Sequence, residues 1–497
     1  MLKLLFVFLP LLILSVFVSK FNTLEIPRFN ETRAQSASDW PMAGANPQRT
    51  SWISEGVSPS GIACTKLFNP YIPHKIQVIG AGELVYISTA KGVYALNHSN
   101  CQQQWFYATE MPVGHSPTYD NGVLYFGVYD KKIHAVNATT GSPIWTFTGN
   151  AGFDNNPVVV NGVLYTGGRD GYFYAINASS GSEIWRYNAG TPLSYSPAYD
   201  DGVLYFGDRA GRAYALRDNG SSASLVWKTN PLSGSGFSSY WPVVNGDRVI
   251  FTGGHHYGFY RVDSGSASGK PTEFERDEAW PSGSTSNSSI LGPMDGSGWV
   301  TASTAYNYLR NKPWRQTVFI LNKSSGAKME TPPLIWQGNS STENRAPAVV
   351  NGNDNLTYFY TGMVYNSAIP WARTAGWKPD TPEKLYYPCG ISGDLLNRSC
   401  GQAIDKPGAI SSAGNYIYLE TNRGKNFIYH NINGSGLNKF SLSAPGDHVT
   451  FARFEYGMEF PEGGNGTDDD THGLHAGPTP FRGKVYVITY NQLYVYQ

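Results

Sequence analysis

The stretch Asn465–Pro478, which reads NGTDDDTHGLHAGP, holds the densest group of side chains that could do chemistry. Asp468, Asp470, His472 and His475 could bring oxygen and nitrogen ligands to one divalent ion. Their spacing matches no established loop such as the calcium-binding D-x-[DN]-x-[DN]-G pattern, and a solvated acidic loop explains the same residues as well. We therefore expect a polar loop here and assign no metal ligand.

Two adjacent histidines, His255 and His256, lie in the sequence GGHHYG. Neighbouring residues of a strand point to opposite faces of a sheet, so these two rings cannot readily share one metal ion, and a polar turn is the favoured interpretation. The chain also contains no G-x-S-x-G, H-E-x-x-H or phosphate-cradling loop. The sequence therefore predicts no catalytic, metal-binding or cofactor-binding residue.

The balance of charge argues against a nucleic-acid partner. Lys plus Arg and Asp plus Glu each number 37, so the formal net charge is zero, and no sustained basic cluster occurs. A nucleic-acid partner usually needs a basic stripe that replaces the counterions of the phosphates.

Four cysteines are compatible with two disulfides in an exported chain. Cys389 and Cys400 bracket the short loop CGISGDLLNRSC and are the easiest pair to close. Cys64 and Cys101 then remain, and aligning CTKLFNP with CQQQWFY puts them near the start of equivalent strands in neighbouring units, where a bridge is feasible. No adjacent Cys pair, C-x-x-C or C-x-x-C-H occurs, which argues against zinc ribbons, thioredoxin chemistry and covalent haem.

Twelve N-x-[ST] sequons are candidates for glycosylation in a host that modifies exported asparagines. Turn chemistry alone could generate several of them, because asparagine is also a turn residue of the repeat described next. The candidates are Asn30, Asn97, Asn137, Asn177, Asn219, Asn287, Asn322, Asn339, Asn355, Asn397, Asn433 and Asn465.

A repeat of about forty residues must position all of these groups. The segment 161–187, NGVLYTGGRDGYFYAINASSGSEIWRY, recurs upstream from Asn121 and downstream from Asp201. GVLYTGG, YFYAIN and SEIWRY each read as a strand, and the preceding NNPVVVN supplies a fourth. Four short antiparallel strands with a period near forty are typical of a propeller blade, and we find no helical apolar spacing.

Fixed positions in the repeat have packing explanations. Alanine at the third strand keeps the sheet thin, at Ala95, Ala135, Ala175 and Ala215. A tryptophan on the outer strand can lie across the neighbouring blade and bury much of its surface. These structural tryptophans are Trp105, Trp145, Trp185 and Trp227.

The predicted fold is all-β, a single propeller of four-stranded antiparallel blades. Regular blades cover about 75–230 and irregular blades with insertions cover about 231–497. The C-terminal GPTPFRGKVYVITYNQLYVYQ has three strands, and the N-terminal CTKLFNP is an orphan outer strand that would join it and close the ring. Nine strand clusters are legible. Eight blades are the prediction, with seven and nine as alternatives.

The N-terminus has a different character. In MLKLLFVFLPLLILSVFVSK, the apolar run Leu4–Val18 lies between Lys3 and Lys20 and has the length of a secretory h-region. A cleavage site is hard to place, so a signal peptide and an uncleaved signal-anchor both stay open. We expect residues 1–36 to be this segment with a short linker, and residues 37–497 to be an exported, extracytoplasmic propeller, secreted or membrane-anchored.

The repeat resembles that of the pyrroloquinoline-quinone-like (PQQ-like) propeller superfamily. AVNATTGSPIWTF and AINASSGSEIWRY are similar to its tryptophan-docking pattern A-x-D-x-x-T-G-x-x-x-W, and DWPMAGANPQRTSW (Asp39–Trp52) is similar to the lead-in before its first blade. The likeness is strong from about Asp39 to Trp227. The superfamily's Asp is Asn here, at Asn97, Asn137, Asn177 and Asn322, and both side chains can cap the turn.

The resemblance implies one of two functional classes, because fold does not fix function. Quinoprotein dehydrogenases hold the quinone over a calcium ion on the ring axis, often beside a vicinal disulfide, and oxidise alcohols or sugars. Other members are non-catalytic platforms that hold partners with loops. This chain has no Cys-Cys, and no position matches the catalytic base or the calcium ligands.

The sequence therefore favours an exported, non-catalytic scaffold without cofactor, which binds a protein or a surface glycan at the cell surface or envelope. It would contact the membrane only through the N-terminal segment, and its oligomeric state is not assigned. The alternative is a dehydrogenase dependent on PQQ and calcium. The late insertions Lys270–Ser289, Asn307–Arg315 and Ile369–Ala403 are the expected binding loops, since function tends to lie on loops held by a rigid scaffold.

Overall fold

The computed structural model describes most of the regular repeat and parts of the later units. Its compact unit is Ala37–Gln497. The described residues are 38–57, 62–68, 72, 76–232, 236–238, 240–253, 318–329, 347–353, 355–364, 370–377, 379, 410–420, 425–431, 451–457, 477–488 and 492–497. Within these residues every regular element is a strand, and no helix is long and apolar enough to cross a membrane.

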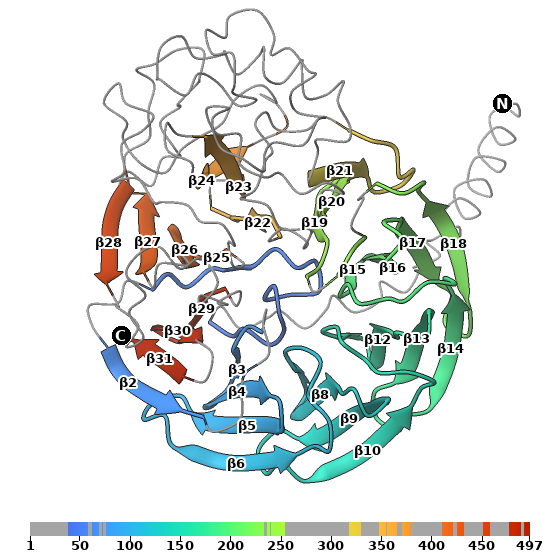
Figure 1. Ribbon diagram of the computed structural model, residues 1–497, viewed down its shortest axis with the longest axis horizontal. Coiled ribbons are helices and arrows are strands. Elements are labelled where there is room, and N and C mark those ends of the chain that lie inside the picture. The colour runs from blue at the N-terminus through green and yellow to red at the C-terminus, as the bar shows by residue number, and fades with distance from the viewer. Residues whose placement is uncertain are drawn as a thin grey trace, which may run out of the picture. The chain divides into compact units, whose positions relative to one another are not determined.

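The strands form eight sheets that follow one another around a ring, which confirms the predicted propeller (Figure 1). We number the blades 1 to 8 in chain order and give their strands from the ring axis outwards. Blade 1 contains β3 (Ile79–Ala81), β4 (Leu84–Thr89), β5 (Gly92–Asn97) and β6 (Gln103–Ala108). Blade 2 contains β7 (Thr118–Asp120), β8 (Val123–Gly127), β9 (Lys132–Asn137) and β10 (Pro143–Thr148). Blade 3 contains β11 (Val158–Val160), β12 (Val163–Gly167), β13 (Tyr172–Asn177) and β14 (Glu183–Asn188). Blade 4 contains β15 (Ala198–Asp200), β16 (Val203–Gly207), β17 (Ala213–Asp218) and β18 (Ala223–Lys228).

The later blades have the same order of strands. In the described residues, blades 5 and 6 show three strands each. Blade 5 contains β19 (Val243–Asn245), β20 (Arg248–Thr252) and β21 (Val318–Asn322), and blade 6 contains β22 (Val349–Val350), β23 (Thr357–Val364) and β24 (Pro370–Trp377). Blade 7 is β25 (Ser411–Ala413), β26 (Tyr416–Glu420), β27 (Lys425–Asn431) and β28 (Phe451–Gly457). Strand β24 begins the segment Ile369–Ala403, so the start of that expected loop is a strand instead.

Blade 8 closes the ring with strands from both ends of the chain. It contains β29 (Thr479–Phe481), β30 (Lys484–Ile488), β31 (Gln492–Tyr496) and, as the outer strand, β2 (Ile62–Leu67). Strands β2 and β31 are antiparallel, with Cys64 opposite Val495. The N-terminal outer strand therefore joins the last blade, as predicted, and this covers the edge that β31 would otherwise expose.

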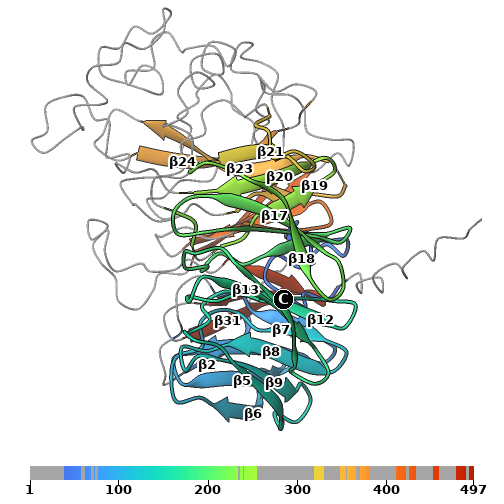
Figure 2. The same cartoon turned by 90° about the vertical axis from the view of Figure 1, so that its right-hand side faces the viewer.

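Antiparallel order gives the ring two distinct faces. In the described residues, turns between the first and second strands lie at the same end of a blade as turns between the third and fourth strands, and we call this end the turn face. Hairpins between the second and third strands, together with the connectors to the next blade, share the other end, which we call the hairpin face. Figure 2 shows the blades edge-on between these two faces.

The outer tryptophans hold neighbouring blades together. Each is opposite the predicted small alanine of its own sheet, as Trp105 is opposite Ala95 and Trp145 is opposite Ala135. The Trp105 Nε1 donates a hydrogen bond of 3.0 Å to the Ala138 carbonyl in blade 2. A Cβ at Gly141, whose φ is 73°, would come within 2.8 Å of the Trp105 ring, so this turn requires glycine.

Candidate functional site

The ring axis is filled by the chain's own N-terminal segment, residues 38–57, drawn in blue across the centre of Figure 1. Its β1 (Trp52–Ile53) pairs in parallel with β25, and its backbone bonds the inner strands of six blades. Those bonds join Trp40 to Gly80, Tyr119 to Pro41, Tyr199 to Pro47, Val244 to Gln48, Val350 to Thr50 and Ser412 to Ser51. The segment therefore holds the blades from within.

Arg49 is the centre of this axial segment. Its side chain is fully buried, and among the described residues it donates only to oxygen atoms that carry no formal charge. The acceptors are the carbonyls of Ala43, Asn156, Pro157 and Pro197 together with the Asn156 Oδ1. Burial lowers the pKa of Arg49 to about 9, so the guanidinium is still charged at neutral pH.

Amide side chains complete the axial network. Asn156 Nδ2 donates to the Ser116 carbonyl at 2.6 Å, and Asn156 N–H donates to Ser196 Oγ at 2.8 Å. Gln77 Oε1 accepts from the Gly44 N–H at 2.9 Å. These bonds link the segment to blades 1, 2, 3 and 4 through uncharged groups.

A polar cluster lies on the hairpin face of blades 2 to 4. Tyr129, Arg169 and Arg209 occupy equivalent hairpin positions, and the backbone N–H of each donates at 3.1 Å to a carbonyl of the adjoining connector. The same connectors carry Asp154 and Ser194 two residues further along. We call these five residues the hairpin-face cluster.

Asp154 is the buried charged member of the hairpin-face cluster, and Ser194 is buried beside it. Its side chain is 7% exposed, and its Oδ2 lies 3.6 Å from the Arg169 guanidinium. Burial raises the pKa of the Asp154 carboxyl, and a hydrogen bond from Ser194 and the charges of Arg169 and Arg209 oppose that rise. The Oδ1 finds no hydrogen-bond partner among the described residues.

The two arginines of the cluster are exposed. The Arg169 guanidinium lies 5.5 Å from the centre of the Tyr129 ring, and the Arg209 Nε donates to Ser194 Oγ at 3.3 Å. Their remaining N–H groups can donate to an anionic group, while the Asp154 Oδ1 is buried beneath them. The arrangement suits binding of a polar, negatively charged ligand.

The sequence did not single out this cluster, although a signal was present. Asp154 occupies the connector position held by Gly114 and Ser194 forty residues to either side, so a carboxylate stands where the repeat otherwise has a small residue. The contacts join different blades, and no local pattern reveals them.

The disulfide between Cys64 and Cys101 is present and joins blades 8 and 1, the bridge that the sequence alignment made feasible. Cys64 is opposite Val495 in blade 8 as Trp105 is opposite Ala95 in blade 1. The Cys101 N–H bonds the Asn97 carbonyl as the Gly141 N–H bonds that of Asn137. Cys64 is in the outer strand β2 and Cys101 lies just before the outer strand β6 of the next blade, so both are near the start of equivalent strands, as predicted. They replace the tryptophan and the glycine of the usual blade contact.

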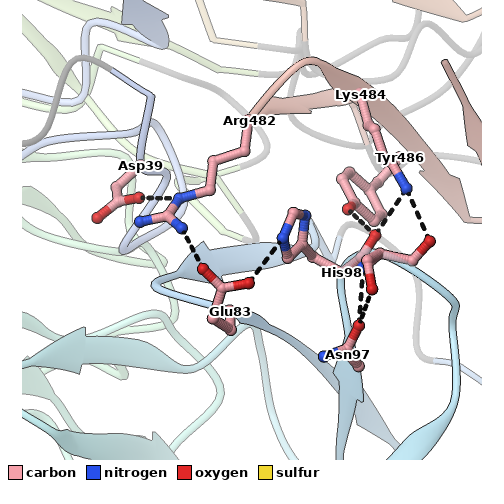
Figure 3. Close-up of polar contacts among 8 residues, drawn as sticks. Asp39, Glu83, Asn97, His98, Arg482, Lys484 and Tyr486 are labelled. Carbon is pink, nitrogen blue, oxygen red and sulfur yellow. Dashed lines mark hydrogen bonds and ion pairs between the residues drawn. The ribbon is translucent and has the colours of Figure 1, made fainter.

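The close-up in Figure 3 shows polar contacts that reinforce the same junction. Arg482 pairs with Asp39 at 3.3 Å and with Glu83 at 2.8 Å, which ties blade 8 to the axial segment and to blade 1. Lys484 Nζ and Tyr486 Oη donate to the His98 carbonyl at 2.9 and 3.2 Å. Burial raises the pKa of Asp39 although Arg482 opposes the rise.

Several predicted features lie outside the described residues. These are the acidic loop with Asp468, Asp470, His472 and His475, the histidines His255 and His256, the pair Cys389 and Cys400, and the insertions Lys270–Ser289 and Asn307–Arg315. Within the described part of the chain, no group of three or more His, Cys, Asp or Glu residues is placed to hold a metal ion.

Comparisons with known proteins agree with this architecture. A family model described as outer membrane protein assembly factor BamB matches residues 89–329 and 169–439. The solved structure of BamB from Moraxella catarrhalis is similar, with 12% identity and a TM-score of 0.50, over 89% of this chain and 100% of that one.

Solved dehydrogenases are similar to the same degree. The quinohemoprotein alcohol dehydrogenase ADHIIG from Pseudomonas putida HK5 shares 12% identity with a TM-score of 0.52, over 93% of this chain and 80% of that one. A europium-containing methanol dehydrogenase shares 12% identity with a TM-score of 0.53, over 93% and 98%. Identities this low show a common fold alone, and no curated protein sequence matches the chain.

Proposed function

The chain belongs to the PQQ-like propeller family whose model is described as outer membrane protein assembly factor BamB, and from that membership we propose that it is an exported, non-catalytic scaffold. It would bind a protein partner or a surface glycan outside the cytoplasm. Residues 1–36 would direct export as a signal peptide or anchor, and residues 37–497 would form the binding unit.

The observation that carries this proposal is the filled ring axis. PQQ with calcium is the cofactor that the dehydrogenase alternative implies, and calcium requires several oxygen ligands, normally with carboxylates among them. The described axial residues do not fit that requirement. The oxygen atoms that surround the Arg49 guanidinium at the centre are four backbone carbonyls and the Asn156 Oδ1, and none of them is a carboxylate.

The hairpin-face cluster supplies a surface that a partner could use. Backbone bonds fix the hairpins that carry Arg169 and Arg209, and contacts to Asp154, Tyr129 and Ser194 orient their exposed guanidinium groups. We place the partner contact on this face, where exposed arginines can donate bidentate hydrogen bonds to carboxylates or acidic sugars.

The test separates the scaffold from the dehydrogenase. Purified protein is given PQQ and calcium, and bound quinone is measured together with dye reduction on a panel of alcohols and sugars. We expect neither stoichiometric quinone binding nor turnover. Quinone bound one to one with turnover would refute the scaffold proposal.

Crosslinking on intact cells tests the positive half of the proposal. Wild-type protein should capture a defined partner, and the double variant Arg169→Ala/Arg209→Ala should lose most of that capture. Arg186→Ala is the matched control, because Arg186 is also an exposed arginine beside a tyrosine ring, but on the outer strand β14. Equal capture by all three proteins would remove the hairpin face from the proposal.

A further inference from the structure

Four sequon asparagines occupy the same turn in four blades. Asn97, Asn137, Asn177 and Asn322 each end the third strand on the turn face. The Oδ1 of each accepts the backbone N–H of the residue two positions later, at 2.9 to 3.0 Å. In three of the turns it also accepts the N–H three positions later.

The fold uses only the oxygen of these side chains. Their Nδ2 groups donate no hydrogen bond to any described residue, whereas Nδ2 of the sequon residue Asn219 donates to Ser224 Oγ at 3.2 Å. An aspartate would supply the same acceptor oxygen to the turn. The amide nitrogen of these four residues is therefore available for a role that the turn does not require.

The same turns receive the neighbouring blade, which fixes their shape. The residue after the asparagine offers its carbonyl to the docking tryptophan, at Ala138, Ala178 and Lys323. At the ring closure the His98 carbonyl takes this part and accepts from Lys484 and Tyr486, directly beside Asn97 in Figure 3. A substituent on Nδ2 leaves all of these acceptors in place.

The sequons share one side of the ring. Strand order puts the four turns on the turn face together with two further described sequons, Asn219 between β17 and β18 and Asn355 between β22 and β23. The hairpin-face cluster is at the opposite ends of the blades. Modification of these asparagines would therefore cover one face and leave the other open.

We propose that Asn97, Asn137, Asn177 and Asn322 carry N-linked glycans, so that sugar shields the turn face while the hairpin face stays free for the partner. The inference rests on the proposed export. In the transfer, Nδ2 bonds to the anomeric carbon of a sugar held as a glycosyl diphosphate. The bond from that carbon to the diphosphate breaks, and the amide releases one proton with the leaving diphosphate.

Peptide mass spectrometry on protein purified from its own cells tests the inference. We expect hexose-containing mass on all four peptides, and a return to the polypeptide mass after chemical deglycosylation. Asn137→Asp keeps the turn acceptor and removes the nitrogen, while Thr139→Ala keeps the asparagine and removes the sequon hydroxyl. Both variants should lose the added mass at position 137 alone and should share one melting temperature, because each keeps the turn acceptor and the other three glycans.

Asn188→Asp is the matched control. The Asn188 Oδ1 also caps a turn, with the Gly190 N–H at 2.8 Å, but the residue has no sequon and ends β14 on the hairpin face. Its glycan mass should equal that of the wild type. Protein recovered from outside the cytoplasm with unmodified turn peptides would overturn the glycan inference and leave the scaffold standing. Protein confined to the cytoplasm would overturn both.

Discussion

The disulfide at the ring closure gives the sharpest prediction. At three other contacts in the described residues, an outer tryptophan lies against a turn glycine of the next blade, as Trp105 does against Gly141. Between blades 8 and 1 the same two positions are Cys64 and Cys101. We therefore expect the disulfide to stabilise the junction of blades 8 and 1, where the two ends of the chain meet, as the tryptophan contact stabilises other junctions.

The magnitude follows from the loop that the bond closes. The two cysteines are 37 residues apart, and loop-closure entropy for that length amounts to about 4 kcal/mol as an upper estimate. Burying a tryptophan of roughly 200 Å² at 25 cal/mol per Å² contributes about 5 kcal/mol, also an upper estimate. The two devices are thus of similar strength, and one can substitute for the other.

The assay compares urea midpoints with and without reductant, in proteins that all carry Cys389→Ser/Cys400→Ser so that only one disulfide is tested. Reductant should lower the midpoint of the protein that retains Cys64 and Cys101, and Cys64→Ala/Cys101→Ala should match its reduced form. Cys64→Trp/Cys101→Gly should recover part of the lost urea midpoint, since glycine also suits the φ of 60° at position 101. The midpoint of this variant should not change with reductant. A midpoint insensitive to reductant in the first protein, or no recovery in the last, would refute the reasoning.

Three further predictions concern buried charges. Burial raises the pKa of Asp154 above its unfolded value, so its ionisation lowers the free energy of unfolding as pH rises through the folded pKa. Asp154→Asn should therefore raise the urea midpoint at pH 7, and it should reduce partner capture. Burial lowers the pKa of His134 below its unfolded value of 6.5, although the Asp130 carboxylate lies 3.0 Å from the ring. The free energy of unfolding should therefore fall as pH drops from 7 to 5. In urea titrations, His134→Gln should make the unfolding free energy depend less on pH. Arg49→Met leaves the Asn156 Oδ1 and several carbonyls unpaired and should cost about 3 kcal/mol by denaturant unfolding, whereas an unchanged midpoint would contradict the axial role.

The regular blades were predictable because their contacts repeat with the sequence. The forty-residue period fixes which strands pair, and the alanine opposite each outer tryptophan follows from the register. The closing strand was predictable for a related reason, since an orphan strand at one end matches a missing strand at the other.

The axial segment was not predictable from local pattern. Its course depends on bonds to inner strands that are spread over more than three hundred residues, from Gly80 to Ser412. The sequence Asp39–Trp52 marks a lead-in but contains nothing that requires Arg49 to meet the carbonyls of Pro157 and Pro197. Those acceptors belong to the connectors that lead into blades 3 and 4, and they converge only when these blades pack side by side.

The two faces of the ring are under different constraints, and this difference supports placing the partner on the hairpin face. On the turn face, each short turn needs a side-chain oxygen that caps it and a carbonyl that faces the next blade, so packing restricts its residue types. On the hairpin face, Tyr129, Arg169 and Arg209 are anchored by their backbone N–H groups, which every residue type except proline provides. The fold therefore tolerates different side chains at these three positions. Packing alone does not explain why two of them are arginines above a buried carboxylate. A buried Asp154 with a raised pKa costs stability at neutral pH, as expected where a fold gives up stability to keep a binding group in position.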